Sequence, residues 1–119
     1  MSNPTANRRK GAKFEIDLLN YLRKEGFEAE RLRLTGKLDE GDIILDGING
    51  SFVLEAKATK VVDLAGFVTQ AELERNNYVK RRGLDIAQYG FAAVIKRRMK
   101  GIDKSYVVTP LDEFLFRSL

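Results

Sequence analysis

The sequence of 119 residues contains no histidine and no cysteine. Without histidine, the usual general base and the usual transition-metal ligand are missing, which excludes serine–histidine hydrolases, histidine–metal nucleases and zinc enzymes. Without cysteine there are no disulfides, thiol nucleophiles or thiolate metal sites, which is compatible with a reducing compartment. Any chemistry must therefore use carboxylates, lysine, tyrosine or hydroxyl groups, and carboxylates favour hard cations such as Mg²⁺ or Mn²⁺.

Long apolar runs are also missing. None approaches the ~20 residues that a membrane span needs, and residues 1–10 lack the apolar stretch of a secretory signal. We therefore expect a cytoplasmic protein with no membrane partner. Hydrophobic residues make up 44% of the chain, which suits one core in a chain too short for two domains. The net charge of +4 and the pI near 9.4 are compatible with a polyanionic partner or with an ordinary basic surface.

Apolar periodicity predicts three helices. The first covers about residues 12–25 and ends at Gly26, and the second covers 64–82 and ends at Gly83. A short terminal helix is expected after Thr109 and Pro110, with the threonine hydroxyl as its cap and the proline at its first position.

Five strands are predicted between these helices, at residues 27–34, 42–45, 51–59, 89–96 and 105–108. The expected order is helix, three strands, helix, two strands, helix. Residues 1–10 are expected to form a flexible basic arm, followed by a single domain over residues 11–119.

The turn between the second and third strands predicts their register. A two-residue loop at 48–49 and a four-residue loop at 47–50 both place Asp46 level with Ser51. Counting outward then puts Asp42 opposite Glu55, with Cβ atoms ~5 Å apart and Lys57 on the same face. An odd-length loop would break this register. The other face is almost purely apolar and should belong to the core.

Two facing carboxylates repel unless they are protonated or neutralised, and a lysine with a divalent cation would neutralise them. The pattern therefore suggests a metal site. A surface salt-bridge cluster, with each pair contributing only ~0–1 kcal/mol, is the alternative. Glu15 shares a helix face with Leu18, Leu19 and Leu22, which favours a third acid directed at the same site. The alternative for Glu15 is an acid at the rim of the apolar stripe.

These motifs resemble a known group of enzymes. Arg9-Lys-Gly with Glu15, then Gly41-Asp42-Ile, then Glu55-Ala-Lys57 resembles the PD-(D/E)XK nuclease superfamily, especially the archaeal-type Holliday junction resolvases, over about residues 8–116. The resemblance implies a restriction-endonuclease-like α/β fold, a mixed β-sheet flanked by helices. It also implies a homodimer with two active sites that cleaves paired strands of branched DNA, such as four-way junctions, with Mg²⁺. Gly41 stands where the superfamily name has proline.

By this resemblance, Asp42 and Glu55 are the metal-binding carboxylates, Lys57 is the catalytic lysine and Glu15 completes the site. The Ala56 carbonyl is a further candidate ligand. The implied reaction is phosphodiester hydrolysis by a metal-activated water, in which Lys57 orients the water or stabilises developing charge. Asp39 and Glu40 also lie in the loop before the second strand, but Asp42 is favoured because it is in register with Glu55.

Phosphate contacts are expected to hold the DNA. The candidates are Arg8, Arg9, Lys10, Lys13, Arg31, Arg33 and the loop hydroxyl of Thr35. Residues 96–100 form a second basic patch, either DNA-binding or solvated. Gln70, Glu74 and Asn77 share a helical stripe that faces either the substrate or solvent. Three alternatives remain: a restriction or repair nuclease, a non-catalytic DNA-binding module, and a structural protein with a fortuitous acidic cluster.

Overall fold

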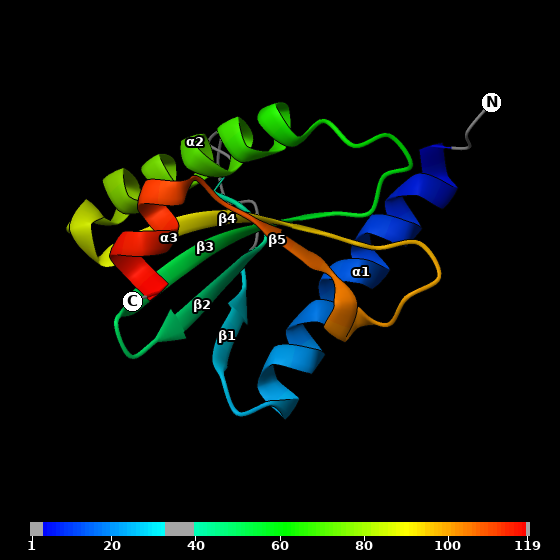
Figure 1. Cartoon of the computed structure of the whole chain (residues 1–119), viewed down its shortest axis with the longest axis horizontal. Helices are drawn as coiled ribbons and strands as arrows, with labels where there is room; N and C mark the ends of the chain where they lie inside the picture. The colour runs from blue at the N-terminus through cyan, green and yellow to red at the C-terminus, as the bar shows by residue number, and fades with distance from the viewer. Residues whose placement is uncertain (1–3, 33–39, 119) are drawn as a thin grey trace.

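The structure, a computed structural model, describes residues 4–32 and 40–118, which form one five-stranded mixed sheet flanked by three α-helices (Figure 1). The helices are α1 (Pro4–Lys24), α2 (Leu64–Arg82) and α3 (Leu111–Ser118), with short 3₁₀ helices η1 (Ile86–Gln88) and η2 (Ile102–Lys104). The strands are β1 (Glu28–Arg31), β2 (Ile43–Gly47), β3 (Gly50–Lys57), β4 (Tyr89–Ile95) and β5 (Tyr106–Val108). The predicted order of helices and strands is confirmed.

The sheet has the strand order β1-β2-β3-β4-β5, in which only β3 and β4 run parallel among the described strands. A parallel pair needs a crossover connection, and α2 supplies it. As a result, β3 and β4 end at the same edge of the sheet, where Lys57 is level with Ile95. Segments that follow the two strands therefore start beside each other.

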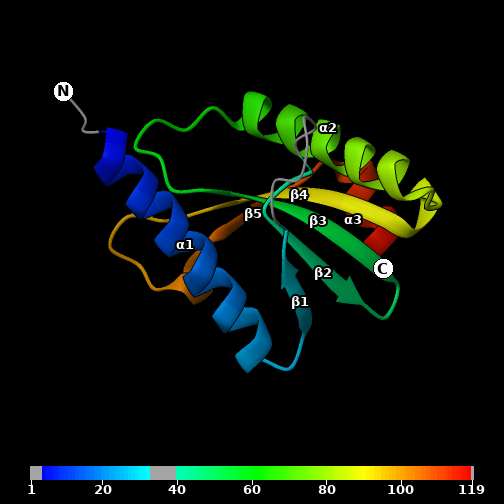
Figure 2. The same ribbon diagram turned by 180° about the vertical axis from the view of Figure 1, so that it is seen from behind.

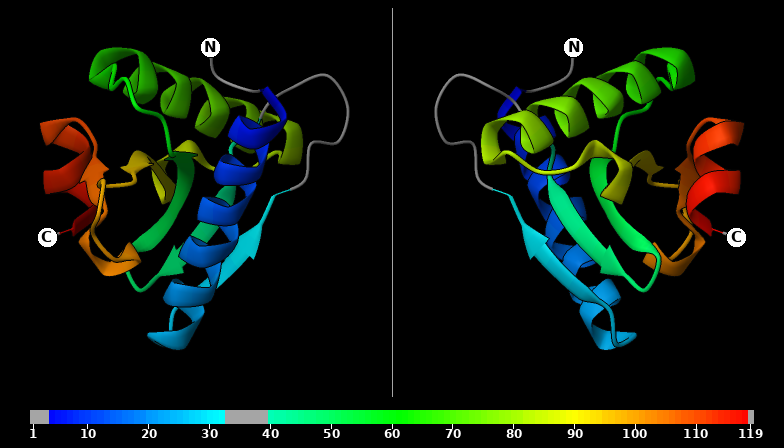
Figure 3. Two further views of the ribbon diagram at one scale, coloured as in Figure 1. Left: turned by 90° about the vertical axis from the view of Figure 1, so that its right-hand side faces the viewer. Right: turned by 90° about the vertical axis from the view of Figure 1, so that its left-hand side faces the viewer.

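Helices α1 and α2 cover opposite faces of the sheet (Figures 2 and 3). Successive strand residues point to opposite faces, so Ile43 packs under α1 while Ile44 packs under α2. The core under α1 is formed by Phe14, Leu18, Leu19, Ala29, Ile43, Leu54, Ala92 and Val94. The smaller core under α2 is formed by Ile44, Val53, Tyr78 and Val79. Burial of both faces leaves the ends of the strands as the place for polar side chains.

Helix α1 begins at Pro4, earlier than the predicted start near residue 12. The expectation of an arm before the helix is therefore wrong for residues 4–10, which are helical. Proline has a fixed φ that suits the first turn of a helix, and the alanine, arginine and lysine residues that follow are strong helix formers. The segment lacks apolar periodicity, which explains why the prediction missed it. No helix within the described ranges is long and apolar enough to cross a membrane.

Helix α3 begins at Leu111, and the predicted threonine cap is wrong. The Thr109 hydroxyl donates to the Phe91 carbonyl at 2.7 Å, which ties the end of β5 to β4. The Phe114 N–H instead donates to the Pro110 carbonyl at 3.0 Å, so the proline precedes the first helical residue. The first turn contains the acids Asp112 and Glu113, which suit the positive end of the helix dipole.

Gly90 at the start of β4 leaves room for α3, and Gly90→Ala is expected to destabilise the protein by roughly 1–3 kcal/mol through overpacking. An added Cβ would lie 2.5 Å from Arg117 Cδ and 2.8 Å from Phe52 Cε1. Gly11→Ala is the control, because a Cβ there meets nothing within 4 Å and alanine gains about 0.5–1 kcal/mol over glycine inside a helix. Urea unfolding measures both, and equal stability of Gly90→Ala and wild type would contradict the packing argument.

Candidate active site

The β2–β3 hairpin brings two acids close together. Asp46 pairs with Ser51 around the two-residue loop 48–49, as predicted, and the predicted register continues to Ile43, which pairs with Leu54. Asp42 comes just before β2, and its N–H donates to the Leu54 carbonyl at 3.0 Å, so that the Leu54 carbonyl faces both Asp42 and Ile43, as in a β-bulge. The Ala56 N–H donates to the Asp42 carboxyl, and the Glu55 carboxylate acts on it electrostatically, so Asp42 and Glu55 are neighbours.

The turn before β2 depends on Gly41. This residue has φ of 91°, in the left-handed region that glycine adopts readily and that proline cannot adopt. A Cβ here would lie only 2.7 Å from Val53 Cγ1. Glycine thus allows the chain to turn closely over β3 and to place Asp42 just before β2.

The Asp42 carboxyl is half-buried, and its environment disfavours negative charge. Burial, followed by the neighbouring Glu55 carboxylate, raises the pKa of Asp42 from 3.8 to about 8. A hydrogen bond with Glu15 acts in the same direction on this pKa. The Ala56 N–H donates to Asp42 Oδ2 at 2.7 Å and opposes the rise, because it favours the charged form. In the cation-free protein, Asp42 therefore holds a proton at neutral pH.

Glu55 is buried at 6% exposure and shares its surroundings with Lys57. Lys57 Nζ lies 3.3 Å from Glu55 Oε1 and donates to Gln70 Oε1 at 2.8 Å. Glu55 Oε2 is buried and has no hydrogen-bond partner among the described residues. This ion pair is not at the surface, unlike the salt-bridge cluster considered as an alternative.

Helix α1 contributes Glu15 from the neighbouring layer. Besides its contact with Asp42, Glu15 Oε2 accepts from Arg31 Nη2 at 3.0 Å and from Nε at 3.2 Å. Two other cations of the same helix have different partners, since Lys13 pairs with Asp17 and Arg23 pairs with Glu30. The structure thus brings Glu15, Asp42, Glu55 and Lys57 together from three elements, with Arg31 attached through Glu15.

Sequence reasoning left two residues of α2 out of the site. Gln70 Nε2 donates to Glu55 Oε1 at 3.3 Å and to Glu74 Oε1 at 2.9 Å. Since Gln70 also accepts from Lys57, one amide links three site groups. The sequence predicted that the stripe Gln70, Glu74 and Asn77 faces either the substrate or solvent. Glu74 is only 1% exposed, so at that residue the stripe faces the interior of the protein.

Glu40 is not part of this cluster. It is 3% exposed and pairs with Arg82, while Arg81 Nη1 lies 3.5 Å from its Oε1. Glu40 therefore ties the loop before β2 to the end of α2, and Asp42 remains the acid of this segment that neighbours Glu55. The other alternative, Asp39, lies outside the described residues.

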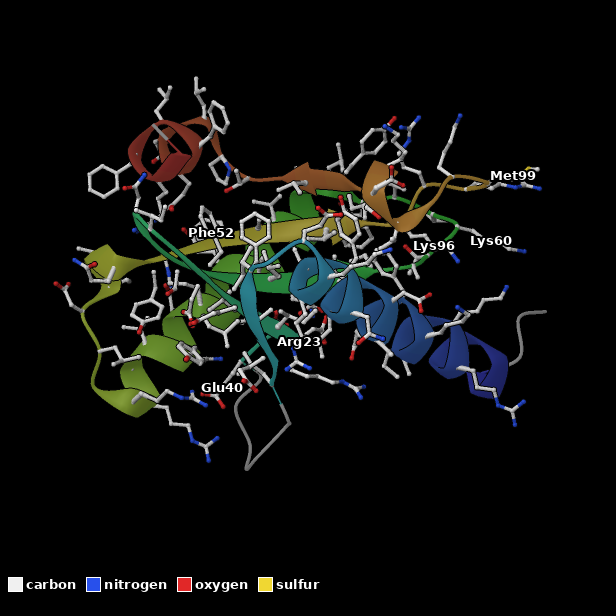
Figure 4. All side chains as sticks on the ribbon, turned by 90° about the horizontal axis from the view of Figure 1, so that it is seen from below. Arg23, Glu40, Phe52, Lys60, Lys96 and Met99 are labelled. Carbon is white, nitrogen blue, oxygen red and sulfur yellow. The ribbon has the colours of Figure 1, made fainter. Side chains whose placement is uncertain are left out.

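The predicted DNA-contact residues are spread over one end of α1 and its surroundings. Arg8 lies within α1, and Arg9, Lys10 and Lys13 are exposed on it. Arg33 and Thr35 lie outside the described residues. The basic segment 96–100 starts beside the site, because the Lys96 N–H donates to the Lys57 carbonyl at 2.9 Å. Figure 4 places Lys60, Lys96 and Met99 at the same end of the molecule.

Among the described residues, no group of three or more acidic, histidine or cysteine side chains is arranged as a ready cation site. Two observations nevertheless fit a hard divalent cation at Asp42 and Glu55. The unpartnered Glu55 Oε2 is a buried acceptor, and the pKa of Asp42 is raised by burial and then by the Glu55 carboxylate, both of which a bound cation would offset. Oxygen donors of this type suit Mg²⁺ or Mn²⁺.

The stability that Asp42 gives the cation-free protein is expected to fall as the pH rises. Between the unfolded pKa of 3.8 and the folded pKa of about 8 for Asp42, the folded state binds more protons than the unfolded state. The contribution of Asp42 to the free energy of unfolding is therefore fully present below pH 3.8 and is lost as the pH rises through about 8. The total loss is on the order of a few kcal/mol. Urea unfolding in EDTA at pH 5.5 and 8.5 measures the loss, and a stability contribution from Asp42 that rises with pH would contradict it.

Comparisons with known proteins agree with this fold. The structure of Hjc, a Holliday junction resolvase from the archaeal hyperthermophile Archaeoglobus fulgidus, is similar with a TM-score of 0.50 and 26% sequence identity. The match covers 76% of this chain and 67% of the Hjc chain. No protein-family model matches the chain, and no curated protein sequence is similar to it. The predicted restriction-endonuclease-like α/β fold is therefore confirmed, and it is the fold of a resolvase-like nuclease.

Proposed function

We propose that this chain is a magnesium-dependent endodeoxyribonuclease of the PD-(D/E)XK type that cleaves branched DNA, such as four-way junctions, in DNA recombination or repair. The observation that carries the proposal is the closeness of the half-buried Asp42 to the buried Glu55, with Lys57 Nζ 3.3 Å from Glu55. Similarity to Hjc, a Holliday junction resolvase, supports a nuclease acting on the same class of DNA.

Each site residue has a distinct proposed role. Asp42 and Glu55 would hold Mg²⁺, with Mn²⁺ able to replace it and the Ala56 carbonyl as a further donor. When bound, the cation supplies the acidity that makes water a nucleophile near neutral pH and offsets charge on the phosphate. Lys57 would place its positive charge beside the reacting phosphate. Glu15, held by Arg31, would keep Asp42 oriented and add a third carboxylate.

Gln70 would position Lys57. Its amide oxygen accepts from Lys57 Nζ, and its amide nitrogen donates to Glu55, so the relative placement of the two groups depends on one side chain. Phe67 lies on α2 together with Gln70, and its ring is 5.3 Å from Lys57 Nζ, facing the ammonium group. Residues of α2 would therefore act through Lys57 and Glu55 rather than on the substrate itself.

Phosphate groups of the DNA would lie along the edge where β3 and β4 end. The first half of α1, the loop before α2 and the loop after β4 gather there, on the right of Figure 1. Exposed cations on these segments include Arg9, Lys10, Lys13, Lys60, Lys96, Arg98 and Lys100. Such contacts hold DNA through its backbone and make binding depend on salt. Paired cuts in a junction would require two copies of the chain, each with one site.

Cleavage of labelled four-way junctions, linear duplexes and single strands, with Mg²⁺ or EDTA, tests the proposal with wild type and Glu55→Gln. The expected result is paired, Mg²⁺-dependent nicks confined to the junction and lost in Glu55→Gln. If linear DNA is cut equally well, the proposal of a resolvase is wrong and a restriction or repair nuclease is supported instead. Binding without cutting under any cation would overturn the nuclease, and absence of binding at low salt would overturn DNA as the partner.

A further inference from the structure

Helix α1 and the segment that follows β4 enclose a hollow beside the sheet. The helix is in contact with η2, and the two lie side by side in Figure 2. The hollow between these segments has a volume of about 490 Å³, which is within the range of pockets for small ligands. We call it the α1–η2 pocket. Six of its lining residues carry the argument: Phe14, Tyr21, Lys24, Lys96, Lys100 and Ile102.

The floor of the α1–η2 pocket is apolar. Phe14 is 3% exposed and belongs to the core under α1, and Ile102 of η2 packs against the same core. Tyr21 follows Phe14 by seven residues, which is close to two helical turns, so both lie on one face of α1. The Tyr21 side chain is half-buried. A partly accessible aromatic ring therefore borders a well-packed apolar floor, which suits a flat apolar group.

The rim of the pocket carries three ammonium groups. Lys24 comes from the last turn of α1, whereas Lys96 and Lys100 come from the segment after β4, and all three are exposed. Among the described residues, none of the three has an acidic partner. Asp17 also lines the pocket, but its carboxylate is paired with Lys13 at 2.7 Å. Positive charge therefore gathers at the rim without a counter-charge, which favours an anionic ligand.

A nucleotide combines the two properties that the floor and the rim require. Phosphate groups bind to lysine side chains, and every base has a flat face that stacks on an aromatic ring. The exposed amide of Asn20, also in the lining, can donate to and accept from the edge of a base. We propose that the α1–η2 pocket binds one unpaired nucleotide of a DNA strand, with its base stacked on Tyr21 and its neighbouring phosphates at the three lysines.

The pocket adjoins the candidate active site through both of its walls. Phe14 directly precedes Glu15 on α1, and the Lys96 N–H donates to the Lys57 carbonyl at 2.9 Å. A strand with one phosphate at Lys57 therefore reaches the pocket within a few nucleotides. A base that is already unpaired is turned out of the stack at the lowest cost. The inference rests on the proposed function for DNA as the partner, and it adds a reason to prefer branched over fully paired DNA.

Photo-cross-linking in EDTA, where no cleavage is expected, tests the pocket separately from catalysis. The probe is 5-iododeoxyuridine, which links to an aromatic side chain stacked on it, placed in one duplex either unpaired in a bulge or paired with adenine. The unpaired probe is expected to link to Tyr21, as mapped by mass spectrometry, and the paired probe is not. Phe116, a 73% exposed aromatic residue on α3, is the internal control.

The outcomes of this experiment separate the pocket from the nuclease. Equal yields from the two probes, or attachment at Phe116 as often as at Tyr21, would overturn the proposal. Junction cleavage without a Tyr21 cross-link would overturn the pocket alone. Absence of any DNA binding at low salt would overturn the proposed function together with the pocket.

Affinity for a short single-stranded oligonucleotide, measured by fluorescence anisotropy in EDTA, gives a second test. Tyr21→Ala is expected to weaken binding by ~5- to 150-fold, as for the loss of one stacked base. Lys100→Met remains informative if Tyr21→Ala fails to fold, because Lys100 is exposed. It is expected to lower the slope of log K against log salt by ~0.7, as for one phosphate contact on a single strand.

Lys80→Met is the matched control, because it removes the same charge from an exposed position on α2. An equal change of slope in Lys80→Met and Lys100→Met would mean that only the net charge matters, which would overturn the pocket. Free thymidine 5′-monophosphate is expected to bind far more weakly than the oligonucleotide, because it lacks the neighbouring phosphates. Equal affinity for the two would overturn a DNA strand as the ligand.

Discussion

Asp42→Asn is expected to lower junction cleavage at least ~1,000-fold while making the cation-free protein more stable. The first effect follows because the amide removes a charged ligand for Mg²⁺ from the pair with Glu55. The second follows because burial beside Glu55 raises the pKa of Asp42 to about 8, so above that pH the folded state must hold an unfavourable charge. An amide of the same shape carries no charge and still accepts from the Ala56 N–H.

Two assays on the same variant separate these effects. Single-turnover cleavage measures the loss of activity, and urea unfolding in EDTA at pH 9 measures the gain in stability. Asp46→Asn is the control, since Asp46 is an exposed acid on the same hairpin that accepts from the Ser51 hydroxyl at 2.6 Å. Retained cleavage in Asp42→Asn would remove Asp42 from the site. A loss of both cleavage and stability would mean that the charge of Asp42 supports the fold.

The proximity of Asp42 and Glu55 could be predicted because it follows from the local register of the β2–β3 hairpin, which is as predicted from Ile43 to Gly47. A two-residue turn and the alternation of strand side chains determine the register, and a shift of one residue would bury the acids in the core under α1. The ends of α2 were predicted for a similar reason, since Gly83 has φ of 62° and its N–H closes the helix on Lys80.

The contacts of Gln70 and Glu40 could not be predicted, because they join segments far apart in the chain. Gln70 meets Glu55 only after the connection before α2 folds that helix back over the sheet. Glu40 pairs with Arg82, 42 residues away. The sequence contains both acids of the loop before β2, but only the packing of α2 shows that Glu40 turns away from Glu55.

The two ends of the described chain show a different failure of prediction. Helix α1 extends back to Pro4 through residues with high helix propensity and no apolar stripe, so periodicity did not detect it. Helix α3 was detected, but its orientation was not, because apolar residues normally face the core. Here the buried pair Glu113 and Arg117 determines which side of the helix faces inward.

Lys57→Met is expected to lower cleavage by ~100- to 10,000-fold while Mg²⁺ still stabilises the protein. Methionine fills a similar volume but cannot donate to Gln70 or neutralise Glu55, from which Lys57 Nζ is 3.3 Å distant. The carboxylates of Asp42 and Glu55 remain, and without the lysine charge their negative charge is less neutralised, which favours binding of a cation. The Mg²⁺-induced rise in Tm should therefore persist in Lys57→Met and disappear in Asp42→Asn.

Lys60→Met provides the matched control, because Lys60 is an exposed lysine in the connection that follows β3. This variant is expected to cleave within a few-fold of wild type at low salt and to lose slightly more activity as salt increases, as for a phosphate contact. Parallel loss of Mg²⁺ stabilisation and cleavage in Lys57→Met would mean that the lysine holds the two acids in place instead of acting on the phosphate. Persistence of the Tm shift without cleavage would separate cation binding, by Asp42 and Glu55, from the charge that Lys57 adds during the reaction.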